Sequence, residues 1–125
     1  MSELEKKLKE MGLSIPEAPA PVAAYVPGVK VGDFIYTSGQ IPLVNGVVRY
    51  QGKAGLDLSL ETAKEAAKIC ALNCLGVVKS LVGDLEKVEQ IVKVVGYVNS
   101  APDFTAQPQV VNGASELLGE LFGKK

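Results

Sequence analysis

The stretch GVKVGDFIYTSGQIP, Gly28 to Pro42, is typical of a β-hairpin whose second strand ends abruptly. Two β-rich runs flank a Gly-Asp pair at the spacing of a two-residue hairpin turn, so we expect strands near residues 24–31 and 34–38. The second run stops at Ser38-Gly39, and the final proline cannot donate to a continuing ladder. A strand that ends in a hydroxyl, a glycine and an amide is either a tight bend or a place where the backbone meets a ligand.

Helical and extended patterns alternate on both sides of this hairpin. Before the hairpin we expect a short amphipathic helix built on Leu4, Leu8 and Met11 and closed by Gly12, and then a proline-rich arm over residues 14–22. After the hairpin we expect a turn at Asn45-Gly46, a strand over residues 47–50 and a helix over residues 60–81 capped by Ser59. The chain then continues with a strand over residues 91–98 and a helix from Gln107-Pro108 to Gly123. This order predicts an α+β fold, a mostly antiparallel sheet with two main helices on one face.

The run IVKVVGYV, Ile91 to Val98, carries apolar side chains on both faces of the expected strand, with Lys93 its one charge. A sheet covered by helices on one face only should alternate apolar with polar residues. Something besides the helices must therefore cover the second face. We infer a partner subunit there, the alternative being a central strand of a larger sheet.

Composition excludes several classes of protein. The chain has 125 residues, no histidine, one arginine (Arg49), and a net charge of −1. One domain of ordinary globular composition is expected, without imidazole-based triads or zinc sites and without a basic surface for nucleic acid. No apolar run approaches the length of a membrane span, and no signal peptide is visible, so a cytoplasmic location is expected. Cys70 and Cys74 are expected to be small core residues.

The hairpin sequence resembles the signature of the Rid family, also called the YjgF or endoribonuclease L-PSP family. The long helix, the following VEQIVKVVGYVNSAPDF and the helix QVVNGASELL occur in that family's order. The resemblance covers residues 15 to 123, within a single domain over residues 1–125. Residues 1–14 form an N-terminal helix extension, typical of a subgroup with a longer start, and whether it borders or blocks a cleft is left open.

The resemblance implies a bacillus-type chorismate-mutase-like fold, assembled as a homotrimer with clefts between subunits. It also implies a hydrolase that deaminates reactive 2-imino and enamine acids, such as 2-aminoacrylate, to 2-keto acids and ammonia, with no metal or organic cofactor. The alternative is a non-catalytic trimer that binds a small carboxylate or metabolite. Neutral charge and a single arginine argue against an endoribonuclease or translation inhibitor.

The residues that match the family's pocket are Tyr25, Ser38, Gly39, Gln40 and Asn112. A phenol and a hydroxyl could donate to a substrate, and a glycine lets the backbone approach it closely. Each residue also has a structural interpretation: a bend or bulge at Ser38-Gly39, a strand aromatic at Tyr25, and a solvated helix residue at Asn112. Arg49 is expected to be a surface charge.

The family's substrate-clamping arginine and its acidic residue lie on two strands that follow the last helix, so this sequence offers no assignable catalytic residue. We expect those strands beyond Lys125. Three explanations stay open: a piece of a longer chain, a tail left out of the sequence, or a natural variant that has lost the deaminase site. The first two are favoured over the third.

Overall fold

The computed structural model describes residues 2–18 and 25–123. The elements, in chain order, are α1 (Glu3–Glu10), β1 (Gly28–Val31), β2 (Phe34–Thr37), β3 (Leu43–Val44), β4 (Val47–Val48), α2 (Leu60–Val82), a 3₁₀ turn η1 (Leu85–Lys87) and α3 (Gln107–Phe122). The α+β prediction is confirmed. The expected single sheet is wrong for the described residues, because β1–β2 and β3–β4 form two separate antiparallel ribbons.

The β1–β2 hairpin has the predicted two-residue turn, with Val31 opposite Phe34 and Gly32 at a φ of 59°. Its strands are shorter than expected, since β1 begins at Gly28 and β2 ends at Thr37. Residue 24, the expected start of the first strand, lies outside the described residues, as do residues 19–22 of the expected arm.

The second ribbon contains one strand that sequence reasoning missed. Residues 43–44 pair with residues 47–48 across the predicted Asn45-Gly46 turn. Both turn residues have positive φ, 50° and 79°, as a type I′ hairpin turn requires. Strand β4 ends at Val48, two residues before the expected end at residue 50.

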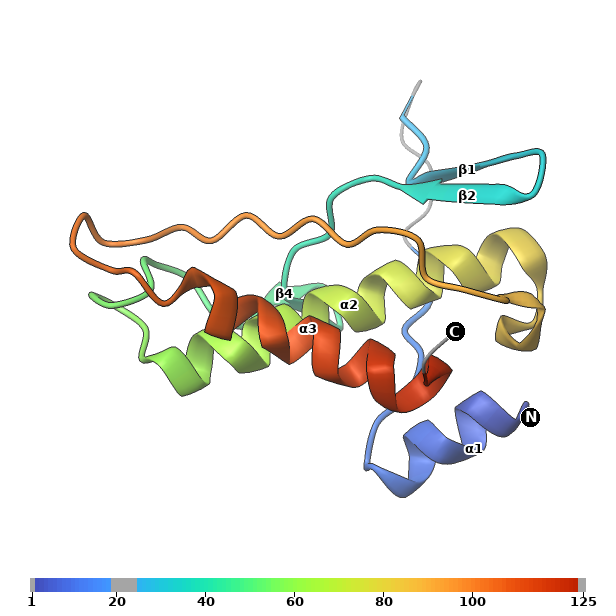
Figure 1. Ribbon diagram of the computed structural model, residues 1–125, viewed down its shortest axis with the longest axis horizontal. Helices are drawn as coiled ribbons and strands as arrows, with labels where there is room; N and C mark the ends of the chain where they lie inside the picture. The colour runs from blue at the N-terminus through green and yellow to red at the C-terminus, as the bar shows by residue number, and fades with distance from the viewer. Residues whose placement is uncertain (1, 19–24, 124–125) are drawn as a thin grey trace.

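Helices α2 and α3 pack against each other as a helical layer, and both ribbons contact α2 (Figure 1). Helix α2 begins at the predicted cap, where the Ser59 hydroxyl accepts from the Thr62 N–H at 3.1 Å. The two helices cross closely at Gly113, where an added Cβ would lie 2.1 Å from the Lys64 carbonyl oxygen. Their contact contains most of the main core, together with α1 and η1: Leu4, Leu8, Ala71, Leu72, Leu75, Leu85, Ala114, Leu117, Leu121 and Phe122.

The hairpin presents an apolar surface away from α2. Gly28 and Thr37 face the helix, since Gly28 lies against Val77 and Thr37 contacts Cys74. Because side chains alternate along a strand, the neighbouring pairs point outward. These outward residues are all large, apolar and exposed: Val29, Val31, Phe34 and Tyr36.

The segment 91–98 runs extended along the helical layer but forms no strand (Figure 1), so the strand prediction is wrong. Among the described residues, no backbone N–H of this segment finds an acceptor, because no described strand lies beside it. The predicted two-sided apolar character is nevertheless present. Gly96 packs against Val111 of α3, whereas Val95 is 57% exposed and Tyr97 94% exposed.

Helix α1 lies on the opposite side of the helical layer from the hairpin (Figure 1). Leu4 and Leu8 are buried in the main core, as predicted, but Met11 lies at its margin and is exposed. The helix therefore completes the core and does not reach the end of β2.

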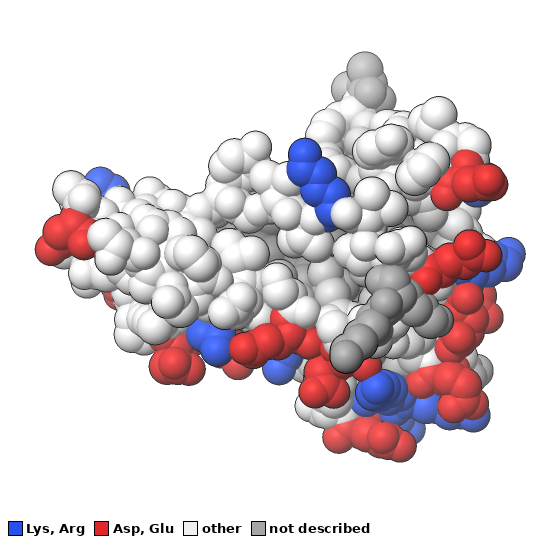
Figure 2. Space-filling view, viewed as in Figure 1, with Lys and Arg blue, Asp and Glu red and all other residues white. Residues whose placement is uncertain are grey.

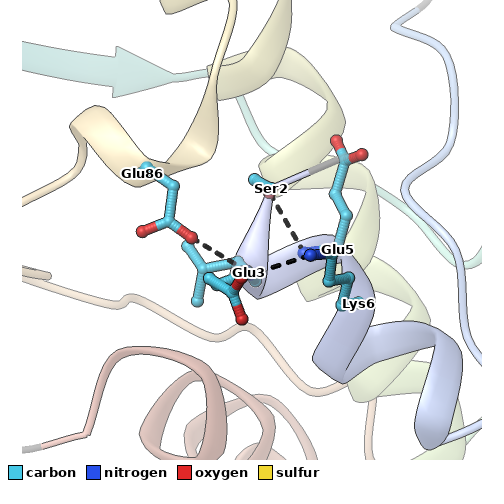
Figure 3. A network of polar contacts seen from close by, with 6 residues as sticks. Ser2, Glu3, Glu5, Lys6 and Glu86 are labelled. Atoms are coloured by element: carbon cyan, nitrogen blue, oxygen red, sulfur yellow. Dashed lines mark hydrogen bonds and ion pairs between the residues drawn. The ribbon is translucent and has the colours of Figure 1, made fainter.

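Polar contacts fix the start of α1 (Figure 3). The Ser2 hydroxyl accepts from the Glu5 N–H at 3.1 Å, which caps the helix, and Lys6 pairs with Glu3 at 3.3 Å. The Glu86 carboxylate of η1 accepts from the Leu4 N–H at 2.9 Å. An acidic group at a helix N-terminus satisfies a free N–H and interacts favourably with the helix dipole.

Candidate functional site

Three of the predicted site residues meet at the end of β2. The hydroxyls of Tyr25 and Ser38 are hydrogen-bonded to each other, and the Gln40 amide donates to the Ser38 hydroxyl at 3.2 Å. Ser38 is itself held by its backbone, whose N–H donates to the Pro27 carbonyl at 2.7 Å. The small hydroxyl therefore links a phenol that precedes β1 with an amide that follows β2.

The hydroxyl pair leaves one proton free for a ligand. Each hydroxyl has one O–H and can also accept, so if Ser38 donates to Tyr25, the phenol can donate outward. Tyr25 is 51% exposed, which leaves it accessible on the described surface. The arrangement can present a hydrogen-bond donor to a small polar molecule.

Gly39 lies between Ser38 and Gln40 and faces open space. An added Cβ there would meet no atom within 4 Å, and the residue does not have the positive φ that favours glycine. Within the described chain, neither packing nor backbone geometry requires glycine at this position. A close approach by a ligand or by another chain would require it.

Asn112 is not joined to these residues. It is exposed on α3, and no hydrogen bond links it to Tyr25, Ser38 or Gln40 within the described part of the chain. A single chain thus brings together four of the five predicted residues, because Gly39 lies between Ser38 and Gln40 in the sequence.

Sequence reasoning missed the residues of α2 that hold this segment. The Asn73 amide donates to the Ile41 carbonyl at 2.9 Å and to the Leu43 carbonyl at 3.0 Å. The Thr37 hydroxyl donates to the Cys74 sulfur at 3.7 Å. The available signal was an asparagine in the middle of a largely apolar helix, a position that asparagine disfavours unless its side chain has a specific partner.

Both cysteines are free thiols and are only partly buried, so the prediction that they are core residues holds only in part. Burial, followed by the neighbouring Cys74, raises the pKa of Cys70 from 9.0 to about 11. Burial also raises the pKa of Cys74, partly opposed by the bond from Thr37. Both groups are therefore protonated, weakly nucleophilic thiols near neutral pH.

Charge on the described surface is unevenly placed. Figure 2 shows acidic and basic side chains gathered over α1 and along the lower edge of the helical layer, with few over the hairpin and the extended segment. Arg49 is exposed just after β4, as predicted, and its backbone N–H donates to the Pro42 carbonyl at 3.0 Å. No extended basic surface is visible on this face.

Two hollows lie away from the β2 end. One, of about 390 Å³, is bordered by Met11 and by charged residues of α2 and α3, including Lys64, Lys68 and Glu116. The other, of about 190 Å³, lies between Val94 and the apolar side of α3.

Within residues 2–18 and 25–123, no group of three or more Cys, Asp or Glu side chains is arranged to hold a metal ion. No helix in the same described ranges is long and apolar enough to cross a membrane.

One family profile matches nearly the whole chain. The profile described as "YjgF/chorismate mutase-like, putative endoribonuclease" matches residues 5–125. Protein TCP17 of Trypanosoma cruzi is 36% identical over 118 residues, which span 94% of this chain and 74% of that protein.

Two crystal structures are similar over almost the whole chain. A protein of unknown function from Agrobacterium tumefaciens is 39% identical with a TM-score of 0.88, covering 97% of this chain and 75% of its own. A "putative endoribonuclease" from Shewanella oneidensis is 33% identical with a TM-score of 0.92, covering 98% and 82%.

Proposed function

Because the chain belongs to the YjgF/chorismate-mutase-like family and has its α+β fold, we propose that it hydrolyses reactive 2-imino and enamine acids to 2-keto acids and ammonia. The observation that carries the proposal is the hydrogen-bonded set of Tyr25, Ser38 and Gln40 beside the open Gly39. It offers a hydrogen-bond donor and an unobstructed backbone to one small polar molecule.

The reaction needs water and a proton but no redox partner. The enamine 2-aminoacrylate rearranges to its imine, and water adds to the carbon of the C=N bond. Breaking the C–N bond of that adduct releases ammonia and leaves pyruvate. In this proposal Tyr25, oriented by Ser38, holds the substrate, and positioning alone can supply a large part of the rate enhancement.

We propose that the functional unit is a homotrimer with clefts between subunits. The apolar outward residues of the hairpin and of the segment 91–98 support a covering partner, since monomers rarely expose such contiguous apolar surface. The half-exposed Tyr25 is consistent with a site that a second subunit closes. Asn112, separate from the other residues within one chain, would then be supplied to a cleft by a neighbouring copy.

A non-catalytic metabolite-binding trimer is the second candidate, and the same residues would serve it. One experiment separates the two. 2-Aminoacrylate is generated in situ, and the release of pyruvate is followed with and without the protein. Faster release supports the deaminase. Saturable pyruvate binding by calorimetry without faster release selects the binding protein. If neither faster release nor pyruvate binding is observed, the deaminase and the binding protein are both contradicted.

The ribonuclease activity suggested by the family description is not favoured. The net charge is −1 and the sequence contains one arginine, whereas RNA binding relies on clustered basic side chains. We expect RNA to stay intact after prolonged incubation with the purified protein.

A further inference from the structure

Two consecutive residues of α2 hold the tripeptide Ser38-Gly39-Gln40 from both sides. Cys74 contacts Thr37, immediately before the tripeptide, and Asn73 binds the carbonyls of Ile41 and Leu43, just after it. The partners lie 30 to 37 positions apart in the sequence, so these contacts tie the loop directly to the longest helix. Of the two, the asparagine amide makes the shorter and stronger hydrogen bonds.

The loop has few other constraints between β2 and β3. On its first side, the Ser38 N–H donates to Pro27. On its second side, the Leu43 N–H donates to Ile41 at 2.7 Å, and the Arg49 N–H donates to Pro42. These bonds close a turn but do not anchor it to the helical layer, a connection that Asn73 supplies.

We propose that Asn73 is a positioning residue that fixes the loop carrying Ser38, Gly39 and Gln40 relative to α2. A link from the loop to ligand affinity rests on the function proposed above. The chemistry requires an amide, because each of its two N–H groups is satisfied by one carbonyl. A carboxylate at the same place would turn an oxygen toward two carbonyl oxygens, and alanine would leave both carbonyls without this donor.

The experiment compares Asn73→Ala and Asn73→Asp with Asn99→Ala. Asn99 is a matched control, since its amide also donates to a loop carbonyl, Gly52, at 3.2 Å, but in a different loop. Hydrogen exchange of the Leu43 and Arg49 amides reports on the loop without a ligand. Calorimetric titration with pyruvate reports on the site.

In both Asn73 variants we expect exchange of the Leu43 and Arg49 amides to rise about tenfold or more, with pyruvate affinity falling roughly tenfold. Asn99→Ala should leave both quantities unchanged. Unchanged exchange in Asn73→Ala, or faster exchange with unaltered affinity, overturns the proposal. If the wild-type protein neither binds pyruvate nor speeds its release from 2-aminoacrylate, the proposed function fails, and the exchange measurement alone supports or overturns the positioning role.

Discussion

The hydroxyl of Tyr25 is hydrogen-bonded to that of Ser38, 13 residues later in the chain. This bond joins the segment that precedes β1 to the end of β2, across the open end of the hairpin. Gln40 donates to the same serine, so Ser38 lies at the centre of the candidate site. Removing either hydroxyl should therefore affect ligand contacts more than folding.

Tyr25→Phe should lower pyruvate affinity about tenfold, or lower the imine-hydrolysis rate by a similar factor, because it removes the donor offered to the ligand. The free energy of unfolding should change by less than about 1 kcal/mol, since the lost bond is exposed to water. Tyr36→Phe is the control, an exposed phenol on the same hairpin. Equal effects of both substitutions on affinity would contradict a specific role for Tyr25.

Gly39→Ala should separate binding from stability. The added methyl group meets open space and a backbone that accepts it, so the melting temperature should stay within a few degrees of wild type. Pyruvate binding should weaken at least tenfold, because the methyl group occupies the space where the ligand approaches the backbone. Calorimetry measures the affinity and thermal unfolding the stability.

Gly28→Ala is the contrasting variant in that experiment. Its Cβ would lie 2.6 Å from a Val77 methyl carbon and 3.1 Å from the Tyr36 carbonyl oxygen, so stability should fall. If Gly39→Ala destabilises the protein as much as Gly28→Ala, or leaves pyruvate binding intact, the site has been placed wrongly.

Local sequence signals predicted the elements whose stabilising contacts lie within the element. Ser59 caps α2 as expected, and the Gly-Asp and Asn-Gly pairs form the two hairpin turns. The segment 91–98 has equally strong β-formers but no paired strand among the described residues. Pairing is a long-range property, and residue preferences alone cannot supply a neighbouring strand.

The candidate site, like the fold, could be predicted from the sequence only where it depends on local residues. The hairpin end and its polar residues follow from the turn chemistry around Ser38, whereas Tyr25 and Asn112 were assigned from the family resemblance. Asn73 was not predicted, because its partners lie 30 and 32 positions away. Side-chain hydrogen bonds to distant carbonyls leave no periodic pattern in a sequence.

Cys70 should react slowly with iodoacetamide. With a pKa of about 11 in place of 9.0, its thiolate fraction below pH 9 is about 100-fold lower than that of an ordinary thiol. Alkylation of the native protein, resolved by peptide fragmentation in a mass spectrometer, should be slower by about that factor than in guanidinium. Comparable rates in the two conditions would show that the thiol is not desolvated.

The same pKa shift predicts a pH dependence of stability. Because the folded-state pKa is raised above the unfolded value, the stabilisation from the protonated thiol is complete below pH 9.0 and is lost as the pH rises toward about 11. Cys70→Ala should therefore show a smaller fall in unfolding free energy over this interval than the wild-type protein. Identical pH profiles from denaturant titrations would contradict the assignment.

Leu8→Ala should destabilise the fold without changing the site. Leu8 has no exposed surface in the main core, so its truncation should cost about 2–5 kcal/mol of unfolding free energy. Pyruvate affinity should stay unchanged below the melting transition, because α1 lies across the helical layer from the hairpin (Figure 1). A loss of affinity in folded Leu8→Ala protein would mean that α1 influences the cleft.

Phe34→Glu should disrupt the proposed trimer while leaving each subunit folded. Phe34 is 52% exposed on the outward apolar face of the hairpin, so a charge there is tolerated in one chain but would be desolvated under a covering subunit. Light scattering after gel filtration should give three times the chain mass for the wild-type protein and a lower mass for the variant. Leu56→Glu serves as the control, because Leu56 is an exposed apolar residue of the loop before α2, and this variant should remain trimeric. A wild-type protein that is monomeric at micromolar concentration would remove the basis for clefts between subunits, and the half-exposed Tyr25 would then have to bind its ligand within one chain.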